Sequence, residues 1–248
     1  MIERVLQGYF KELGPEHPST LRTLNHLGIV YANLGEAKRA EELFDQALEG
    51  YQKACGVSHK STLHTVHYLG VLYSDQGRHQ DASIMLQRAL EGFKAARGLN
   101  DPSTLRTISS LGYLFIKQGK ALEAAQFYEQ ALHGYTRARG PTHPSTLHTL
   151  DKLGRLFNNL NRFGEAEAMF ERAQQGYRAL GLQYASPLRT NAQHGRDNKG
   201  SGSAHERAYQ NANRVVAQGD DAALPMLEIW LDSTTGNVDE KGLAPNTL

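Results

Sequence analysis

The chain has 248 residues, with 27 Lys and Arg against 26 Asp and Glu, and its length allows one or two ordinary domains or one short array of repeats. This near-neutral balance gives no whole-chain attraction to nucleic acid or to an anionic membrane, so we expect neither as a partner. The single cysteine, Cys55, excludes an intramolecular disulfide, and no apolar run reaches the roughly 18–20 residues of a membrane helix. These features favour a soluble, cytoplasmic protein.

The first thirteen residues, MIERVLQGYFKEL, predict a short helix. Charged residues interrupt its apolar positions, which argues against a signal peptide. Leu6 and Tyr9 stand 42 residues before Leu48 and Tyr51, which belong to a later helix. We therefore expect residues 1–13 to be the second helix of an incomplete preceding repeat. Its apolar surface would be covered by more of the same array or by self-association with another chain.

The next part of the chain predicts two helices joined by a turn. Leu24, Leu27 and Tyr31 step by three and four residues, which places them on one helix face. Gly35 can end this helix in a left-handed conformation. The same helical spacing returns in a second helix at Ala40, Leu43, Phe44, Ala47 and Leu48.

This helix–turn–helix unit recurs four times over residues 14–181 with a fixed period of 42 residues, as shown by Gly28, Gly70, Gly112 and Gly154. A fixed period of this size indicates a solenoid, in which each unit buries its apolar face against its neighbours. First helices are expected at 18–34, 60–76, 102–118 and 144–160. Second helices are expected at 37–54, 79–96, 121–138 and 163–179.

The phrase that opens each first helix, HPSTL in the first copy, is a helix-start signal. Its first residue is expected at the N-cap, and Pro18, Pro102 and Pro144 follow at the first helical position, where a missing N–H costs nothing. Lys60 breaks this pattern in the second copy. Because no copy differs from the others as an active copy should, we expect no catalytic Ser, Thr or His here and predict that the protein is not an enzyme.

At these residues the sequence resembles the tetratricopeptide repeat. That family places an apolar residue, Leu-Gly and Tyr/Phe on the first helix, then Ala, an aromatic or Leu, and Ala on the second. The first copy here reads Leu24, Leu27-Gly28, Tyr31, Ala40, Phe44 and Ala47. The usual unit has about 34 residues, and this longer form is similar to the repeats of kinesin light chains. The resemblance implies an all-α fold, a right-handed superhelical solenoid of helix–turn–helix repeats.

The resemblance also implies a protein–protein interaction scaffold without a cofactor, whose first helices line a concave groove for an extended peptide. Carried over position by position, it predicts these groove residues: Arg22, Asn25, Asn33, His64, His67, Asp75, Arg106, Ser109, Tyr113, Lys117, His148, Asp151, Arg155 and Asn159. One column, Arg22, His64, Arg106 and His148, is basic or titratable. It favours a partner with acidic residues, bound more tightly as the pH falls through about 6.5. The alternative is an ordinary solvated helix face.

Two other patterns carry weaker chemical signals. His59, His64 and His67 could bring imidazoles near one helix end, but no carboxylate or thiolate has matching spacing, so we predict no metal site. Cys55 has no neighbouring base and is expected to be a structural thiol.

Residues 182–248 are predicted to be a polar linker and an acidic tail, mostly disordered, with a short helix near 208–218. The tail contains the stretch PMLEIWLD with the only tryptophan. Cargo peptides of kinesin light chains typically carry a tryptophan flanked by acidic residues, which Leu227, Glu228, Trp230 and Asp232 resemble loosely. Our hypothesis is that this tail binds its own groove; the alternatives are an unstructured tail or a helical cap.

Two further functions stay open from the sequence. One is a ligand-sensing or regulatory repeat segment of an NTPase-type (STAND-like) signalling protein, because similar arrays occur at the C-termini of such proteins. The other is a fragment of a kinesin-light-chain-like cargo adaptor. A phosphate-loop motif upstream in the reading frame would identify the first.

Overall fold

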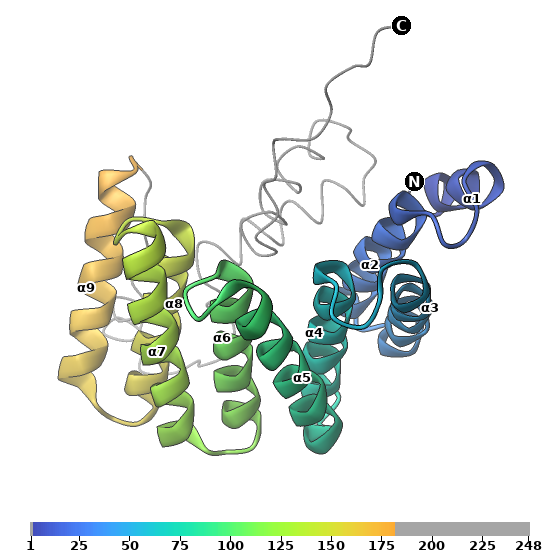
Figure 1. The fold of residues 1–248 in the computed structure, drawn as a ribbon. Coiled ribbons are helices and arrows are strands. Elements are labelled where there is room, and N and C mark those ends of the chain that lie inside the picture. Colours follow the sequence, from blue (N-terminus) through green and yellow to red (C-terminus); the bar gives the residue numbers. More distant parts are fainter. Residues whose placement is uncertain (1, 182–248) are drawn as a thin grey trace, which may run out of the picture.

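The structure, a computed structural model, describes residues 2–181 (Figure 1). Within this range the chain forms nine α-helices and no strand. They are α1 (Ile2–Glu12), α2 (Pro18–Asn33), α3 (Ala37–Cys55), α4 (Lys60–Asp75), α5 (His79–Arg97), α6 (Pro102–Lys117), α7 (Ala121–Arg139), α8 (Pro144–Asn159) and α9 (Phe163–Ala179). All eight helices predicted for the four repeats are present, with ends that differ by at most one residue. The predicted linker and acidic tail, with Leu227, Glu228, Trp230 and Asp232, lie outside the described residues.

Each first helix begins at a side-chain cap, as the repeated phrase predicts. The ring Nδ1 of His17 accepts a hydrogen bond from the backbone N–H of Ser19 at 3.2 Å, and Asp101 caps Ser103 in the same way at 2.8 Å. Lys60, which replaces the proline, does not move the start of α4, because His59 caps this helix as well. The cap residue therefore fixes where the first helices begin.

A second hydrogen bond ties each first helix to the turn before it. The hydroxyl of Thr20 donates to the backbone carbonyl of Gly14 at 2.8 Å. Thr62, Thr104 and Thr146 make the same bond to Gly56, Gly98 and Gly140. All four glycines have φ near +90°. In Gly56, Gly98 and Gly140 ψ is extended, as Gly56 shows with 168°, and side chains disfavour this conformation. This Thr–Gly clasp, as we call it, fixes the geometry of every joint between a second helix and the next first helix.

The two helices of a repeat approach closely at glycines. A Cβ atom built on Gly28 would lie 2.7 Å from the ring of Phe44, and one on Gly70 would lie 2.7 Å from Cγ of Leu86. A second glycine column, which the sequence analysis did not single out, lies at Gly50, Gly92, Gly134 and Gly176 on the second helices. Its members face leucines of the first helices, at 2.2–2.5 Å from such a Cβ.

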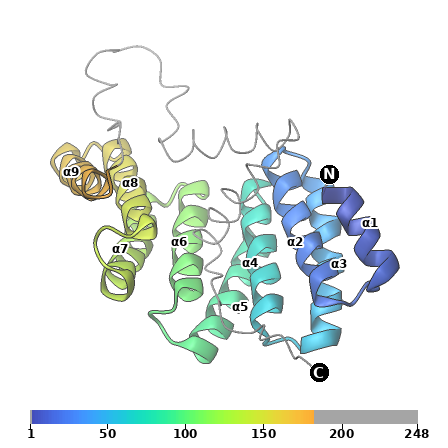
Figure 2. The same cartoon turned by 90° about the horizontal axis from the view of Figure 1, so that it is seen from above.

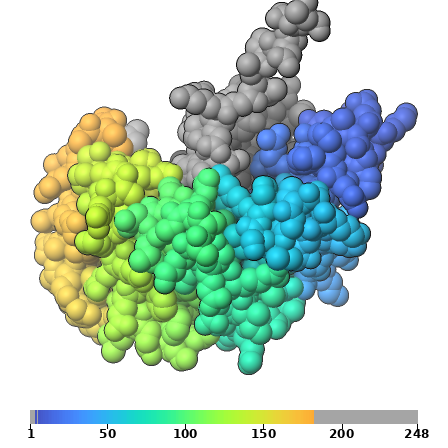
Figure 3. Space-filling view, viewed as in Figure 1, coloured from blue at the N-terminus to red at the C-terminus, as the bar shows by residue number. Residues whose placement is uncertain are grey.

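The repeats stack into a right-handed superhelical solenoid, which confirms the predicted fold class. The main contacts join each helix to the next along the chain, with added contacts between successive first helices such as α4 and α6. One core cluster runs from Phe44 in α3 through Leu72 and Leu86 to Leu111 in α6, so the apolar interior passes from repeat to repeat. Figure 2 shows α2, α4 and α6 along one side of an arc, with α5 and α7 along the other. In Figure 3 the repeats follow one another in chain order without a break.

Candidate functional site

The candidate binding surface is the wall formed by the first helices, α2, α4, α6 and α8. Their apolar residues, such as Leu24 and Leu69, face the second helices and are buried. The fourteen residues predicted to contact a peptide are polar side chains of these helices, and we call these fourteen residues the inner wall.

Five of the predicted residues are buried: His64, discussed below, and four residues that recur at one position of the repeat. The four form the column Asn25, His67, Ser109 and Asp151, with exposed fractions of 6%, 3%, 7% and 4%. The side-chain amide of Asn25 donates to the hydroxyl of Thr65 at 2.8 Å, which joins the first and second repeats. In the next repeat Nδ1 of His67 lies 3.2 Å from the hydroxyl of Thr107. Asn25 and His67 therefore hold the first helices together, and as peptide contacts all four stay predictions.

The column predicted to be basic divides into exposed and buried members. Arg22 is exposed, whereas His64 is only 9% exposed and its Nε2 lies 3.2 Å from the hydroxyl of Ser103. Arg106 is half-buried with its guanidinium over the ring of Tyr68, 5.7 Å from the ring centre, and His148 is half-buried as well.

The environment of His64 corrects the expected pH dependence. Burial, reinforced by the nearby charge of Arg106, lowers the pKa of His64 well below its ordinary value of 6.5. His64 therefore stays neutral as the pH falls through 6.5 and adds no charge to attract an acidic partner there. The expected rise in affinity has no support from this residue.

Acidic side chains of the inner wall are matched by cations. The hydroxyl of Tyr113 donates to Asp75 at 2.5 Å, and Nζ of Lys117 lies 3.7 Å from the same carboxylate. In the fourth repeat Nε of Arg155 donates to Asp151 at 2.8 Å. Asn33 and Asn159 are exposed at the ends of α2 and α8. The pairs made by Asp75 and Asp151 are neutral, and Arg22 and Arg106 therefore leave the fourteen residues with an excess of positive charge.

A cavity of about 90 Å³ opens between α2, α3 and α4. Its lining residues are polar or aromatic: Arg22, Asn25, His26, Tyr51, Lys60, Ser61, His64 and Tyr68. Arg22 and Lys60 contribute positive charge. Burial and the neighbouring Arg22 lower the pKa of His26, so this imidazole is neutral at pH 7.

Three residues of this surface were not among the predicted groove residues. His26 and Tyr68 follow Arg22 and His64 by four residues, and Lys152 follows His148 by four. Residues four apart share a helix face, so this column could have been found from the spacing alone. The positive charge of Lys152 adds to the effect of burial and lowers the pKa of His67, a residue of the inner wall.

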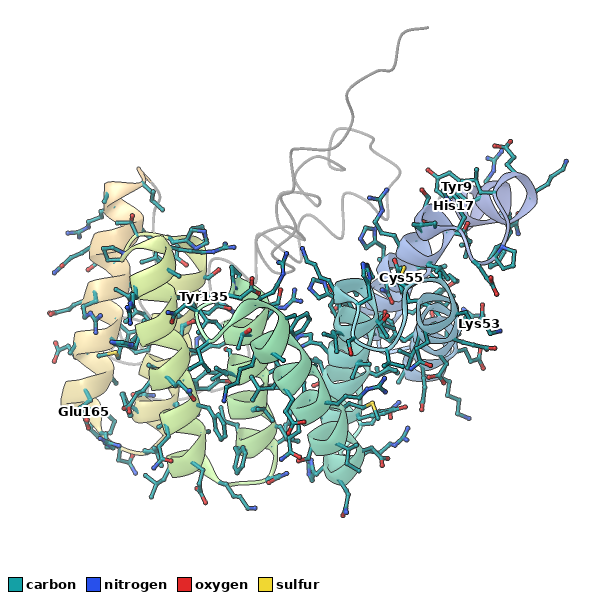
Figure 4. All side chains as sticks on the ribbon, viewed as in Figure 1. Tyr9, His17, Lys53, Cys55, Tyr135 and Glu165 are labelled. Atoms are coloured by element: carbon teal, nitrogen blue, oxygen red, sulfur yellow. The ribbon has the colours of Figure 1, made fainter. Side chains whose placement is uncertain are left out.

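The histidines near the start of α4 and Cys55 were the remaining candidate groups. No three His, Cys, Asp or Glu side chains in this range come together to hold a metal ion, and His59, His64 and His67 thus do not form such a group. Cys55 is exposed at the end of α3, beside the turn to α4 (Figure 4). No helix between residues 2 and 181 is long and apolar enough to cross a membrane.

A second hollow, of about 410 Å³, lies between α1, α2 and α3. Its apolar lining includes Leu6 and Phe10 of α1 and Leu27 and Tyr31 of α2. Phe10 is 37% exposed, which is high for a large apolar side chain in a helix. This hollow is distinct from the polar inner wall.

Comparisons with solved structures show the same repeat architecture. Two crystal structures of a Podosopora anserina protein, described as a kinesin light chain with nearly identical TPR-like repeats, are 25% identical, with TM-scores of 0.57 and 0.55. The match covers 73% of this chain and 85% and 86% of those chains. BtubC (BKLC) from P. vanneervenii is 18% identical with a TM-score of 0.58, over 100% of this chain and 93% of that one, and supports the fold alone. A comparison with curated proteins found no match.

The family model described as tetratricopeptide repeat matches residues 1–53, 19–95, 60–135 and 103–179 in overlapping stretches. These matches span all four repeats and the α1 segment. The structural likeness and the glycine-based packing within each repeat agree with them. The chain therefore belongs to the tetratricopeptide repeat family.

Proposed function

We propose that this protein-interaction scaffold holds an extended acidic peptide along the inner wall. The observation that supports this most is the charge of the wall. Asp75 and Asp151 are each paired with a cation of the wall itself, whereas Arg22 is exposed and forms no ion pair within residues 2–181. Carboxylates of a partner would be attracted by this charge and bound by charge-assisted hydrogen bonds.

Selection from a random peptide library displayed on phage tests the proposal with the full chain as bait. We expect the enriched peptides to contain an excess of Asp and Glu, and their binding to weaken with added salt. Arg22→Glu should reduce this enrichment. Lys38→Glu, which makes the same charge change at an exposed position on the second helix α3, should leave it intact. Enrichment of uncharged peptides, or equal loss in both variants, would contradict the proposal.

The acidic tail gives a second test. Its residues 220–232 carry four acidic side chains and Trp230, and we propose that they compete with other peptides for the inner wall. Removing residues 220–248 should then strengthen the binding of a selected acidic peptide, measured by fluorescence polarisation. Unchanged affinity would end this part of the proposal and leave the groove itself untouched.

Self-association through α1 is a separate proposal, supported by the apolar hollow at Leu6 and Phe10. A second copy of the chain would cover this surface. Light scattering on the full chain at increasing concentration should show a dimer that Phe10→Glu removes. A monomer throughout would refute it. A regulatory role beside an NTPase domain, a cargo-adaptor role and a cytoplasmic location stay predictions.

A further inference from the structure

We propose that the cavity between α2, α3 and α4 is an oxyanion subsite, which takes the phosphate or carboxylate group of a partner's side chain. The cavity adjoins the inner wall, so the subsite deepens the proposed function by naming one place where a bound peptide is anchored. Its own affinity for small anions is measurable without any peptide.

The chemistry of the lining supports an anion. No Asp or Glu is among the eight lining residues, whereas Arg22 and Lys60 enter from two different repeats. Hydroxyl groups of Ser61, Tyr51 and Tyr68 also line the cavity, and those of Ser61 and Tyr51 interact with each other. Burial raises the pKa of Tyr51 to about 12, so its hydroxyl keeps its proton at neutral pH and can donate.

The cavity has room for a small group. Its volume of about 90 Å³ is several times what one ordered water needs, which accommodates a carboxylate or a phosphate group. The ligand would therefore enter by the charged tip of a side chain whose backbone stays on the wall.

The other joints between repeats lack this combination. Where the second repeat has Lys60, the later repeats have Pro102 and Pro144. At the next joint Phe93, without a hydroxyl, replaces Tyr51, and His64 lies within hydrogen-bonding distance of Ser103, at 3.2 Å. The later repeats thus indicate a substitution, Lys60→Pro, that should remove the subsite.

Lys60→Pro is the central variant of the test. His59, the residue before it, already has φ of −68° and ψ of 146°, the extended conformation that a following proline requires. The change should leave the fold intact, as the proline starts of α2, α6 and α8 indicate. Circular dichroism and a thermal melt verify this. Lys38→Gln removes one positive charge away from the cavity and serves as the matched control.

The full chain, labelled with nitrogen-15, is titrated with inorganic phosphate at constant ionic strength and followed by NMR. We expect saturable shifts of the backbone signals of Ser61 and His64. Lys60→Pro should weaken the fitted affinity by about fivefold or more, because it removes one charge-assisted contact, and Lys38→Gln should not change it. Shifts that do not saturate, that lie elsewhere on the chain, or that are equal in wild type and Lys60→Pro would overturn the proposal.

Two further probes identify the source of the group. N-acetyl-phosphoserine amide and N-acetyl-glutamate amide are titrated in the same way. Tighter binding of the first supports a phosphorylated partner, and tighter binding of the second supports an acidic one. If neither shifts the signals of Ser61 and His64, the subsite does not exist. Failure of the library selection with successful phosphate binding would refute only the peptide proposal.

Discussion

Replacing Gly70 by alanine tests how closely the two helices of a repeat must pack. The added methyl group would lie 2.7 Å from Cγ and 3.2 Å from the backbone N of Leu86, whose side chain is fully buried. Cγ is the branch point of that side chain and the nitrogen belongs to α5, so the helices themselves must separate. Such overpacking costs about 1–3 kcal/mol.

Alanine also has a higher helix propensity than glycine, which offsets about 1 kcal/mol of the overpacking cost. The expected net effect is a loss of about 1 kcal/mol, up to about 2, in the free energy of unfolding. For an array of this length each kcal/mol lowers Tm by roughly 2–4 °C. Urea denaturation and a thermal melt of the full chain measure both quantities.

Gly164→Ala is the matched control, because a Cβ at Gly164 has no heavy atom within 4 Å, apart from its chain neighbours and its own helix backbone. It should be neutral or slightly stabilising. The double variant Gly70→Ala with Leu86→Ala should lose less stability than the sum of the single changes, since the clash is then absent. Wild-type or higher stability of Gly70→Ala would refute the argument from close approach.

Three other changes have defined expected outcomes. Asn161, with φ of 59°, stands where the other repeats have a left-handed glycine, so Asn161→Gly should raise the free energy of unfolding by about 0.5–1 kcal/mol in urea denaturation. Thr104→Val removes the hydrogen bond to Gly98 at 2.9 Å and should cost about 1–2 kcal/mol in the same assay; an unchanged midpoint would contradict the role of the clasp. Burial and nearby positive charges lower the pKa of His67 well below 6.5. Below about pH 6.5 the unfolded chain therefore binds more protons than the folded chain, and the free energy of unfolding of the wild type should fall. His67→Asn, which copies Asn25 of the first repeat, should flatten this dependence in denaturation series between pH 5 and 7.

The helices could be predicted because the same local signals occur four times in phase. A capping residue, a turn glycine and apolar spacing all act within a few residues, so the sequence contains them directly. The glycine column that includes Gly50 also recurs every 42 residues in the sequence. It was missed because its reason, a leucine at close range from the preceding helix, is a tertiary contact.

The inner wall was less predictable. Asn25 and His67 are polar residue types that are usually exposed, yet both are buried. Each pairs with a threonine about forty residues further along the chain. This pairing depends on how the superhelix brings successive first helices together, which the local pattern does not specify. The neutral state of His64 follows from the same burial. Arg22, in contrast, is exposed as expected.

The identical clasp at every joint makes the units interchangeable. Deleting one period, residues 56–97, would join Cys55 at the end of α3 to Gly98. The end of α3 would then meet the same clasp, Gly98 with Thr104, that the end of α5 meets now. Gene duplication or unequal recombination can therefore lengthen or shorten the molecule in whole units without a new connection having to evolve. The span available to a ligand would change in equal steps.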